Sequence, residues 1–160
     1  AGAAKFVSDY AAAGLKGSIP LYGPGFLTDG NLDAMGGAGE GLMTTLHYAD
    51  GLDNAKDKTF RTKYATTYKA QPDVYAVQGY DAAQMYEAGL KAAGGDPAKQ
   101  EEVIKGMASA TIESPRGTFT LSKAHNPVQD IYLREVKGSE NQVVEIVSKG
   151  LTDPARGCKL

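Results

Sequence analysis

Residues that could carry out catalysis or bind a metal are few in this sequence and widely spaced. His47 and His125 are its two histidines, and neither has a carboxylate or a cysteine at the spacing of a metal site. No serine stands in a GxSxG elbow, where it could act as a nucleophile. Asp29, Asp50 and Asp81 could each act as a base, but isolated acids are more typical of caps, turns or solvated charges. We therefore predict that the protein is not an enzyme and that it has no metal site.

A glycine-rich loop is the stretch most typical of a ligand site. It lies in "IPLYGPGFLTDGN", residues 19–31, where a short apolar strand runs into several glycines and a proline. Such a turn can hold a phosphate on backbone N–H groups or form one wall of another kind of pocket. The chain has no GxxxxGK[ST] motif, and Gly23-x-Gly25 lacks the third glycine of a dinucleotide fingerprint. We therefore expect a pocket wall and no nucleotide cofactor.

Aromatic residues stand where the backbone is expected to be irregular. Tyr22 ends the predicted strand, Phe26 sits in the glycine loop, and Tyr80 follows Gly79 near the start of a long predicted helix. Ligand pockets of α/β folds lie at the carboxyl ends of strands and are lined by apolar and aromatic side chains. These three rings are therefore candidates for a ligand pocket. The alternative interpretation is that all three belong to the buried core.

Composition restricts the class of protein. The chain has 160 residues, 42% of them apolar and 22% charged, which is typical of one globular domain. Its net charge is −2 and its lysines and arginines form no basic run, which argues against nucleic acid as a partner. No stretch approaches the ~20 apolar residues that a membrane span needs. Cys158 is the single cysteine, so it is either half of a disulfide with a partner elsewhere or a free thiol.

The first fifty residues alternate between helix and strand. We predict a helix over 3–13, a strand over 18–22, a short helix capped by Asp29 that ends near Met35, and a strand over 40–49. This order favours an α/β fold with a parallel sheet and flanking crossover helices. The polar segment 50–57 is interpreted as a linker or hinge.

The rest of the chain is predicted to hold helices first and strands afterwards. The helices are expected over 55–68, 74–93 and 97–107, with Asp73 and Asp96 as N-caps, and the strands over 117–121, 130–136 and 142–147. Phe60, Tyr64 and Tyr68 recur every four residues, a stripe that we interpret as core. In the strand over 130–136, Arg134 and Glu135 are expected on a solvent-exposed face.

Three stretches in this order resemble one family. They are "YAAAGLKGSIPLYGPGFLTDGNLDAMGGAGEGLMTTLHYAD", "DVYAVQGYDAAQMYEAGLKAAGG" and "SPRGTFTLSKAHNPVQDIYLREVKG". Together they resemble the C-terminal part of periplasmic solute-binding proteins of ABC importers, of the branched-chain amino acid and aromatic acid type. The resemblance covers nearly the whole chain. It implies a periplasmic-binding-protein-like (type I) α/β fold with two lobes and three crossings between them, of which this chain is the later portion.

The resemblance also implies a division of the chain between the lobes. Residues 1–48 would belong to the second lobe and 49–127 to the first, and residues 128–160 would return to the second. The lobes would close around a ligand through hinges near 47–52 and 126–130. We expect apolar faces of this portion to drive self-association, as a homodimer or by segment exchange.

Ligand contacts are carried over position by position. Gly25-Phe26 matches the place where amino-acid-binding members of the family have a carboxylate for the ligand's ammonium, and here it holds no acid. Because a buried ammonium without a counter-charge is costly, an aromatic carboxylate is favoured, stacking on Phe26. Tyr80 matches a position that touches the ligand from the other lobe. The predicted ligand-binding residues are therefore Tyr22, Gly25, Phe26 and Tyr80.

The sequence thus predicts a periplasmic, non-enzymatic receptor for a small carboxylate, which delivers its ligand to the membrane permease of an ABC importer. A branched-chain amino acid is the alternative ligand. A sensory or regulatory ligand-binding domain of the same fold is the second hypothesis. A small α/β hydrolase that uses His47 or His125 is the third.

Overall fold

Two compact units make up the chain, and the chain passes between them three times. The structure, a computed structural model, describes residues 2–157. Unit 1 contains the residues up to Leu52 together with Ile131–Ser148, and unit 2 contains Asp53–Asp130 and the residues from Lys149 onward. The third predicted segment, 128–160, is therefore divided between the units. Membership of the predicted segments in the lobes of a larger receptor stays a prediction.

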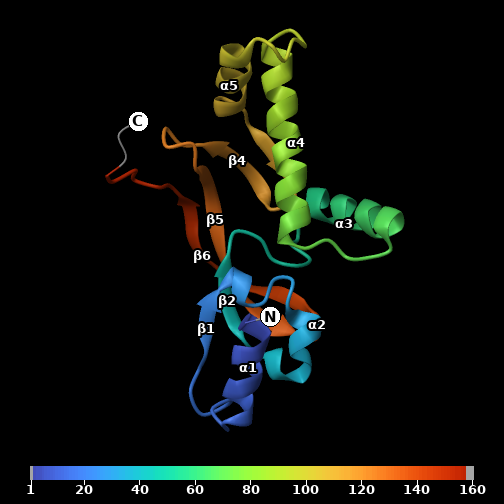
Figure 1. Cartoon of the computed structure of the whole chain (residues 1–160), viewed down its shortest axis with the longest axis vertical. Helices are drawn as coiled ribbons and strands as arrows, with labels where there is room; N and C mark the ends of the chain where they lie inside the picture. The colour runs from blue at the N-terminus through green and yellow to red at the C-terminus, as the bar shows by residue number, and fades with distance from the viewer. Residues whose placement is uncertain (1, 158–160) are drawn as a thin grey trace. The chain divides into compact units, whose positions relative to one another are not determined.

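Unit 1 is built from short helices and a small mixed sheet (Figure 1). Its elements are α1 (Gly2–Ala12), β1 (Tyr22–Pro24), the 3-10 helix η1 (Gly25–Leu27), α2 (Leu32–Met35), the 3-10 helix η2 (Gly36–Gly39) and β2 (Met43–Leu46). The strands β5 (Pro127–Lys137) and β6 (Glu140–Leu151) pair with each other and each run through both units. β1 pairs with β2 in parallel, as predicted, and β2 pairs with the later part of β5 in antiparallel register. The predicted α/β class is confirmed, with a mixed sheet.

The hydrophobic core of unit 1 contains residues of both α1 and this sheet. Val7, Met35, Leu42 and Val136 form a buried cluster, with small apolar residues of α1 packed around it. Along β5, Tyr132, Arg134 and Val136 are the buried residues, while the residues between them are half-buried. The expectation that Arg134 lies on a solvent-exposed face is therefore wrong, because it shares the inward side of the strand with Val136.

The strand before the glycine loop begins later than predicted. Ile19 is exposed, and pairing starts only at Tyr22, which lies opposite Met43. Gly23 and Pro24 therefore belong to β1, and the glycine loop that follows, residues 25–31, begins with the 3-10 turn η1. Asp29 does not cap the short helix either, because α2 begins after Asn31. Residues 18–21, which include the strand former Ile19, have no partner strand, so propensity alone does not make them a strand.

Helices dominate unit 2 (Figure 1). Its elements are α3 (Ala55–Tyr68), α4 (Val74–Ala92), α5 (Gln100–Ala108), β3 (Ile112–Ser114) and β4 (Gly117–Leu121). β3 and β4 form an antiparallel pair, and β4 pairs with the first residues of β5. α5 lies close to α4 because glycines face each other: a Cβ atom on Gly89 would lie 2.7 Å from the Val103 carbonyl oxygen. The core of this unit contains Ile112 and Phe119.

Side-chain caps fix two of the three helices. The Asn54 carboxamide accepts a hydrogen bond from the Asp57 N–H at 2.7 Å, and Asp73 accepts one from the Ala76 N–H at 2.9 Å. The predicted cap at Asp73 is confirmed. The predicted cap at Asp96 is wrong, because that carboxylate accepts from Ala98 within a turn and α5 begins only at Gln100.

None of the helices within residues 2–157 is long and apolar enough to span a membrane. Cys158 lies outside the described residues.

Candidate functional site

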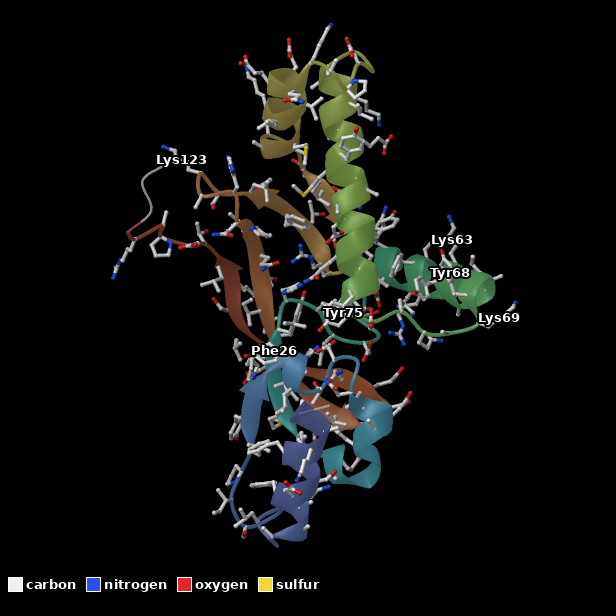
Figure 2. All side chains as sticks on the ribbon, in the orientation of Figure 1. Phe26, Lys63, Tyr68, Lys69, Tyr75 and Lys123 are labelled. Carbon is white, nitrogen blue, oxygen red and sulfur yellow. The ribbon has the colours of Figure 1, made fainter. Side chains whose placement is uncertain are left out.

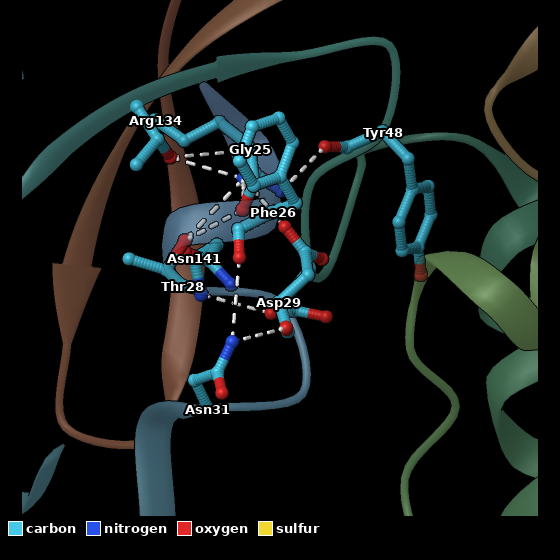
Figure 3. Close-up of polar contacts among 10 residues, drawn as sticks. Gly25, Phe26, Thr28, Asp29, Asn31, Tyr48, Arg134 and Asn141 are labelled. Atoms are coloured by element: carbon cyan, nitrogen blue, oxygen red, sulfur yellow. Dashed lines mark hydrogen bonds and ion pairs between the residues drawn. The ribbon is translucent and has the colours of Figure 1, made fainter. Parts of the chain in front are cut away.

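A buried arginine on β5 is the centre of a polar cluster in unit 1 (Figure 3). Arg134 is 1% exposed, and its Nη2 atom lies 2.7 Å from the Asp29 Oδ2 atom. The Asp29 side chain is buried as well. Burial of a charge is costly unless the group is paired and hydrogen-bonded. Asp29 is therefore an ion-pair partner. Of its three expected roles, the turn is confirmed, whereas the cap and the solvated charge are wrong.

Arg134 also donates hydrogen bonds to three further segments. Nη1 donates to the Tyr48 carbonyl oxygen at 3.0 Å, Nη2 to the Gly25 carbonyl oxygen at 3.3 Å, and both Nε and Nη2 to the Thr44 hydroxyl at 3.2 and 3.0 Å. The planar guanidinium presents its donors in a fixed fork, so these acceptors hold it in one orientation. Arg134 thus connects β5, β2, the segment after β2 and the glycine loop.

The glycine loop has hydrogen bonds between its own residues in addition to those from Arg134. The Gly25 carbonyl oxygen accepts the N–H groups of Thr28 and Asp29, each at 3.0 Å. The Asn31 amide donates to the carbonyl oxygens of Phe26 and Asp29. Gly25 is required here because a Cβ atom would lie 2.6 Å from the Leu46 side chain. A buried and internally bonded turn therefore carries the next residue, Phe26, outward.

The four predicted ligand residues fall into both units. Tyr22 and Phe26 are 64% and 67% exposed in unit 1, whereas Gly25 is buried. Figure 2 shows the side chain of Phe26. Burial in the core, the alternative interpretation, is therefore wrong for Tyr22 and Phe26. Tyr80 belongs to α4 of unit 2 and is half-buried, with its ring centroid 5.1 Å from that of Phe60. The ligand-binding role of all four stays a prediction.

A second buried ion pair lies beside Tyr80 in unit 2. Arg116 Nε is 2.9 Å from Asp81 Oδ2, and the Ser114 hydroxyl donates to the same oxygen at 2.9 Å. Burial raises the pKa of Asp81 above its usual value, although the hydrogen bonds from Ser114 and Arg116 act in the opposite direction. Arg116 also donates to the Gln129 carboxamide. The pair connects α4, at the residue after Tyr80, to the turn between β3 and β4.

The aromatic stripe of α3 lines a groove instead of a core. Phe60 and Tyr64 are half-buried and Tyr68 is 65% exposed, so the core interpretation is wrong for this stripe. A groove of about 430 Å³ is lined by Lys56, Thr59, Phe60, Lys63, Tyr64, Thr67, Tyr68, Ala76 and Tyr80. The Tyr80 ring is packed into this wall, whereas Tyr75, in the first turn of α4, is 56% exposed (Figure 2).

The two histidines lie in different units. His125 stands in the turn after β4 with a positive φ of 58°, and His47 directly follows β2. Within residues 2–157 there is no group of three or more histidine, cysteine, aspartate or glutamate side chains that could hold a metal ion.

Sequence reasoning missed the pair of Arg134 and Asp29. One signal was available: Tyr132, Arg134 and Val136 alternate along β5, so an apolar residue on either side of Arg134 indicated its inward direction. The partner could not be identified in this way, because Asp29 lies 105 residues earlier.

Fold and loop together define a class of α/β ligand-binding proteins, and comparison identifies the family. Residues 1–142 match the family model described as periplasmic binding protein. The chain belongs to the periplasmic binding protein family, which confirms the resemblance seen in the sequence.

Solved relatives carry aromatic acids. The chain is 53% identical, with a TM-score of 0.92, to an ABC-transporter solute-binding protein from R. palustris in complex with benzoate, over 99% of this chain and 44% of that one. It is 31% identical, with a TM-score of 0.83, to a solute-binding protein from Rhodopseudomonas palustris BisB5 in complex with 3,4-dihydroxybenzoic acid, over 96% of this chain and 44% of that one.

A curated relative is named as an amino-acid-binding protein. It is Leu/Ile/Val-binding protein homolog 6 of Brucella abortus, 34% identical over 143 residues, which are 85% of this chain and 36% of the relative. The chain thus spans less than half the length of the relatives that it matches.

Proposed function

We propose that this chain is part of the solute-binding component of an ABC importer, and that the whole protein captures a small aromatic carboxylate. The observation that carries the proposal is the exposed Phe26 ring on the loop that Arg134 holds, in a chain 53% identical to a benzoate complex. A ring held on a rigid turn loses little conformational freedom when a flat ligand stacks on it.

Charge on the loop favours an acid over an amino acid. Asp29 is the only acid between Tyr22 and Asn31, and its carboxylate is buried against Arg134. It is therefore not free to bind the ammonium of an amino acid. A branched-chain amino acid remains the second candidate, because the curated relative is named for leucine, isoleucine and valine.

In unit 2 we propose two ligand contacts, Tyr80 and Tyr75. Tyr80 remains a proposed contact, although its ring already packs on Phe60 and lies 5.4 Å from the Lys56 ammonium. Tyr75, in the first turn of α4, is 56% exposed, so we add it to the proposed ligand residues. A more exposed aromatic ring has more apolar area for a ligand to remove from water, so it contributes more to binding than a ring that is already packed.

Closure of two lobes is the proposed mechanism, with the membrane permease as the partner that reads the closed form and the periplasm as the location. The predicted hinges near 47–52 and 126–130 lie next to the points at which the chain passes between the units, after Leu52 and after Asp130. Self-association is also proposed, through β6, whose Val143, Val144, Ile146 and Val147 are all at least 40% exposed.

Calorimetry of the full-length protein that carries this chain tests the proposal. Benzoate, 3,4-dihydroxybenzoate and leucine are titrated in turn at one pH and ionic strength. We expect binding of at least one benzoate, with leucine weaker by about tenfold or more. Tighter binding of leucine would support the second candidate, and no binding of any of the three would contradict both.

A further inference from the structure

We infer that Arg134 is a positioning residue of the ligand site, which fixes the Phe26 loop to the segments where the chain leaves and re-enters unit 1. The inference rests on the proposed function, because it gives Phe26 a ligand to contact. Hydrogen bonds from the Arg134 guanidinium support it, because they reach both the Phe26 loop and a segment next to a crossing between the units.

Arg134 is close in sequence to one crossing and bonded to a residue close to another. It lies four residues after Asp130, where β5 passes into unit 1. Its Nη1 atom donates to the carbonyl oxygen of Tyr48, four residues before the crossing that follows Leu52. Motion of either crossing segment therefore acts on the guanidinium.

The same guanidinium holds the loop at both of its ends. Nη2 bonds the Gly25 carbonyl oxygen on one side of Phe26 and the Asp29 carboxylate on the other. The loop's other hydrogen bonds to Gly25 come from its own residues, Thr28 and Asp29, and give it a shape but no attachment to the crossings. Arg134 thus sets the orientation of Phe26 relative to β5 and to the segment at Tyr48.

Stability alone is a weak reason for this arrangement. An apolar side chain of similar volume often replaces a buried ion pair without loss of stability. What an apolar residue cannot supply is a fork of donors that reaches Gly25, Asp29 and Tyr48 at once. The structure therefore assigns to Arg134 an effect on ligand affinity through Phe26, beyond any effect on folding.

A double-mutant cycle measures that effect. Affinity for benzoate is determined by calorimetry for the full-length protein and for Arg134→Met, Phe26→Ala and the double variant. Arg134→Met is expected to lower the affinity about tenfold or more, but by less than about threefold when Phe26 is already alanine. Full additivity, or an affinity within about twofold of wild type in Arg134→Met, would overturn the inference.

Val7→Ala is the matched control for stability. Val7 is fully buried in the core of the same unit, where it belongs to the apolar cluster with Met35 and Leu42. It is expected to lower the unfolding midpoint while leaving the affinity within about twofold of wild type. If Arg134→Met does not fold, Arg134→Lys replaces it, because lysine keeps the charge and loses the fork.

A measurement without ligand separates this inference from the proposed function. In hydrogen exchange, the amides of Thr28 and Asp29 should exchange about tenfold faster or more in Arg134→Met, with the amides of α4 unchanged. Val7→Ala should not produce this local change. If wild-type protein binds none of the ligands, the proposed function fails, and unchanged exchange at Thr28 and Asp29 would overturn the positioning role separately.

Discussion

Replacement of Phe26 by alanine tests the ligand wall most directly. The ring is 67% exposed. A phenylalanine has roughly 200 Å² of surface to bury, so about 130 Å² remains available to a ligand. At about 25 cal/mol per Å² this corresponds to about 3 kcal/mol as an upper value. Alanine keeps part of the contact, so we expect a loss of about 2 kcal/mol, or about 30-fold in affinity for benzoate.

The assay is calorimetric titration of the full-length protein, with a second exposed phenylalanine as the control. Phe6 is 53% exposed on α1 and belongs to no proposed contact, so Phe6→Ala should change the affinity by less than about twofold. Phe26→Leu should lie between wild type and alanine, because leucine restores apolar area without the aromatic face. An affinity of Phe26→Ala within about threefold of wild type, with Phe6→Ala equal to it, would refute the reasoning.

Three further predictions concern stability, pH and association. Asp29→Ala should lower the free energy of unfolding by about 3 kcal/mol, because it leaves the buried Arg134 guanidinium without its counter-charge; a urea midpoint close to wild type would contradict this. Since burial raises the pKa of Asp81 above 3.8, its stabilising contribution is complete below that pH and is lost as the pH rises through the raised pKa. Asp81→Asn should therefore flatten the plot of urea midpoint against pH, and an unchanged slope would argue against it. Val144→Lys should shift the sedimentation profile of this chain toward monomer, whereas wild-type protein that is monomeric at high concentration would exclude the β6 contact.

Local signals in the sequence were sufficient for the helices of unit 2. α3 has the predicted bounds, and α4 begins after the predicted cap at Asp73 and ends one residue before its predicted end. Capping and helical periodicity act within a few residues, so they can be recognised without knowledge of the fold. The start of α5 was predicted too early because Asp96 makes a turn instead of a cap.

Strand bounds depended on partners that sequence alone does not supply. β1 was expected to begin at Ser18, but the strand exists only where β2 lies opposite, from Tyr22 to Pro24. β3 was missed because three residues, Ile112–Ser114, show no clear alternation. Such short strands are defined by pairing, and pairing is a property of the folded chain.

The glycine loop was predicted as a site, whereas the residues that hold it were not. Gly25 and Phe26 are conspicuous in the sequence because an aromatic residue stands in a glycine-rich turn, where no helix or strand periodicity requires one. Asp29 resembles an ordinary surface charge in the sequence. The neighbours Tyr132 and Val136 indicate the inward direction of Arg134, but its partner is identified only by their contact across 105 residues. The aromatic stripe of α3 was interpreted as core but lines a groove. Four-residue periodicity identifies one face of a helix but not what covers that face.

Both units contain a buried pair of arginine and aspartate next to a proposed ligand aromatic. Asp29 follows Phe26 by three residues, and Asp81 follows Tyr80 by one. The pairs differ in how completely they are satisfied. Asp81 has one carboxylate oxygen, Oδ1, without a hydrogen-bond partner among the described residues, and burial raises its pKa. If both pairs orient their neighbouring rings, a change of pH near the raised pKa should alter the environment of Tyr80, which tyrosine-ring NMR shifts can report, and Asp81→Asn should abolish that change. A Tyr80 response that persists in Asp81→Asn would show that the pair does not act on the ring.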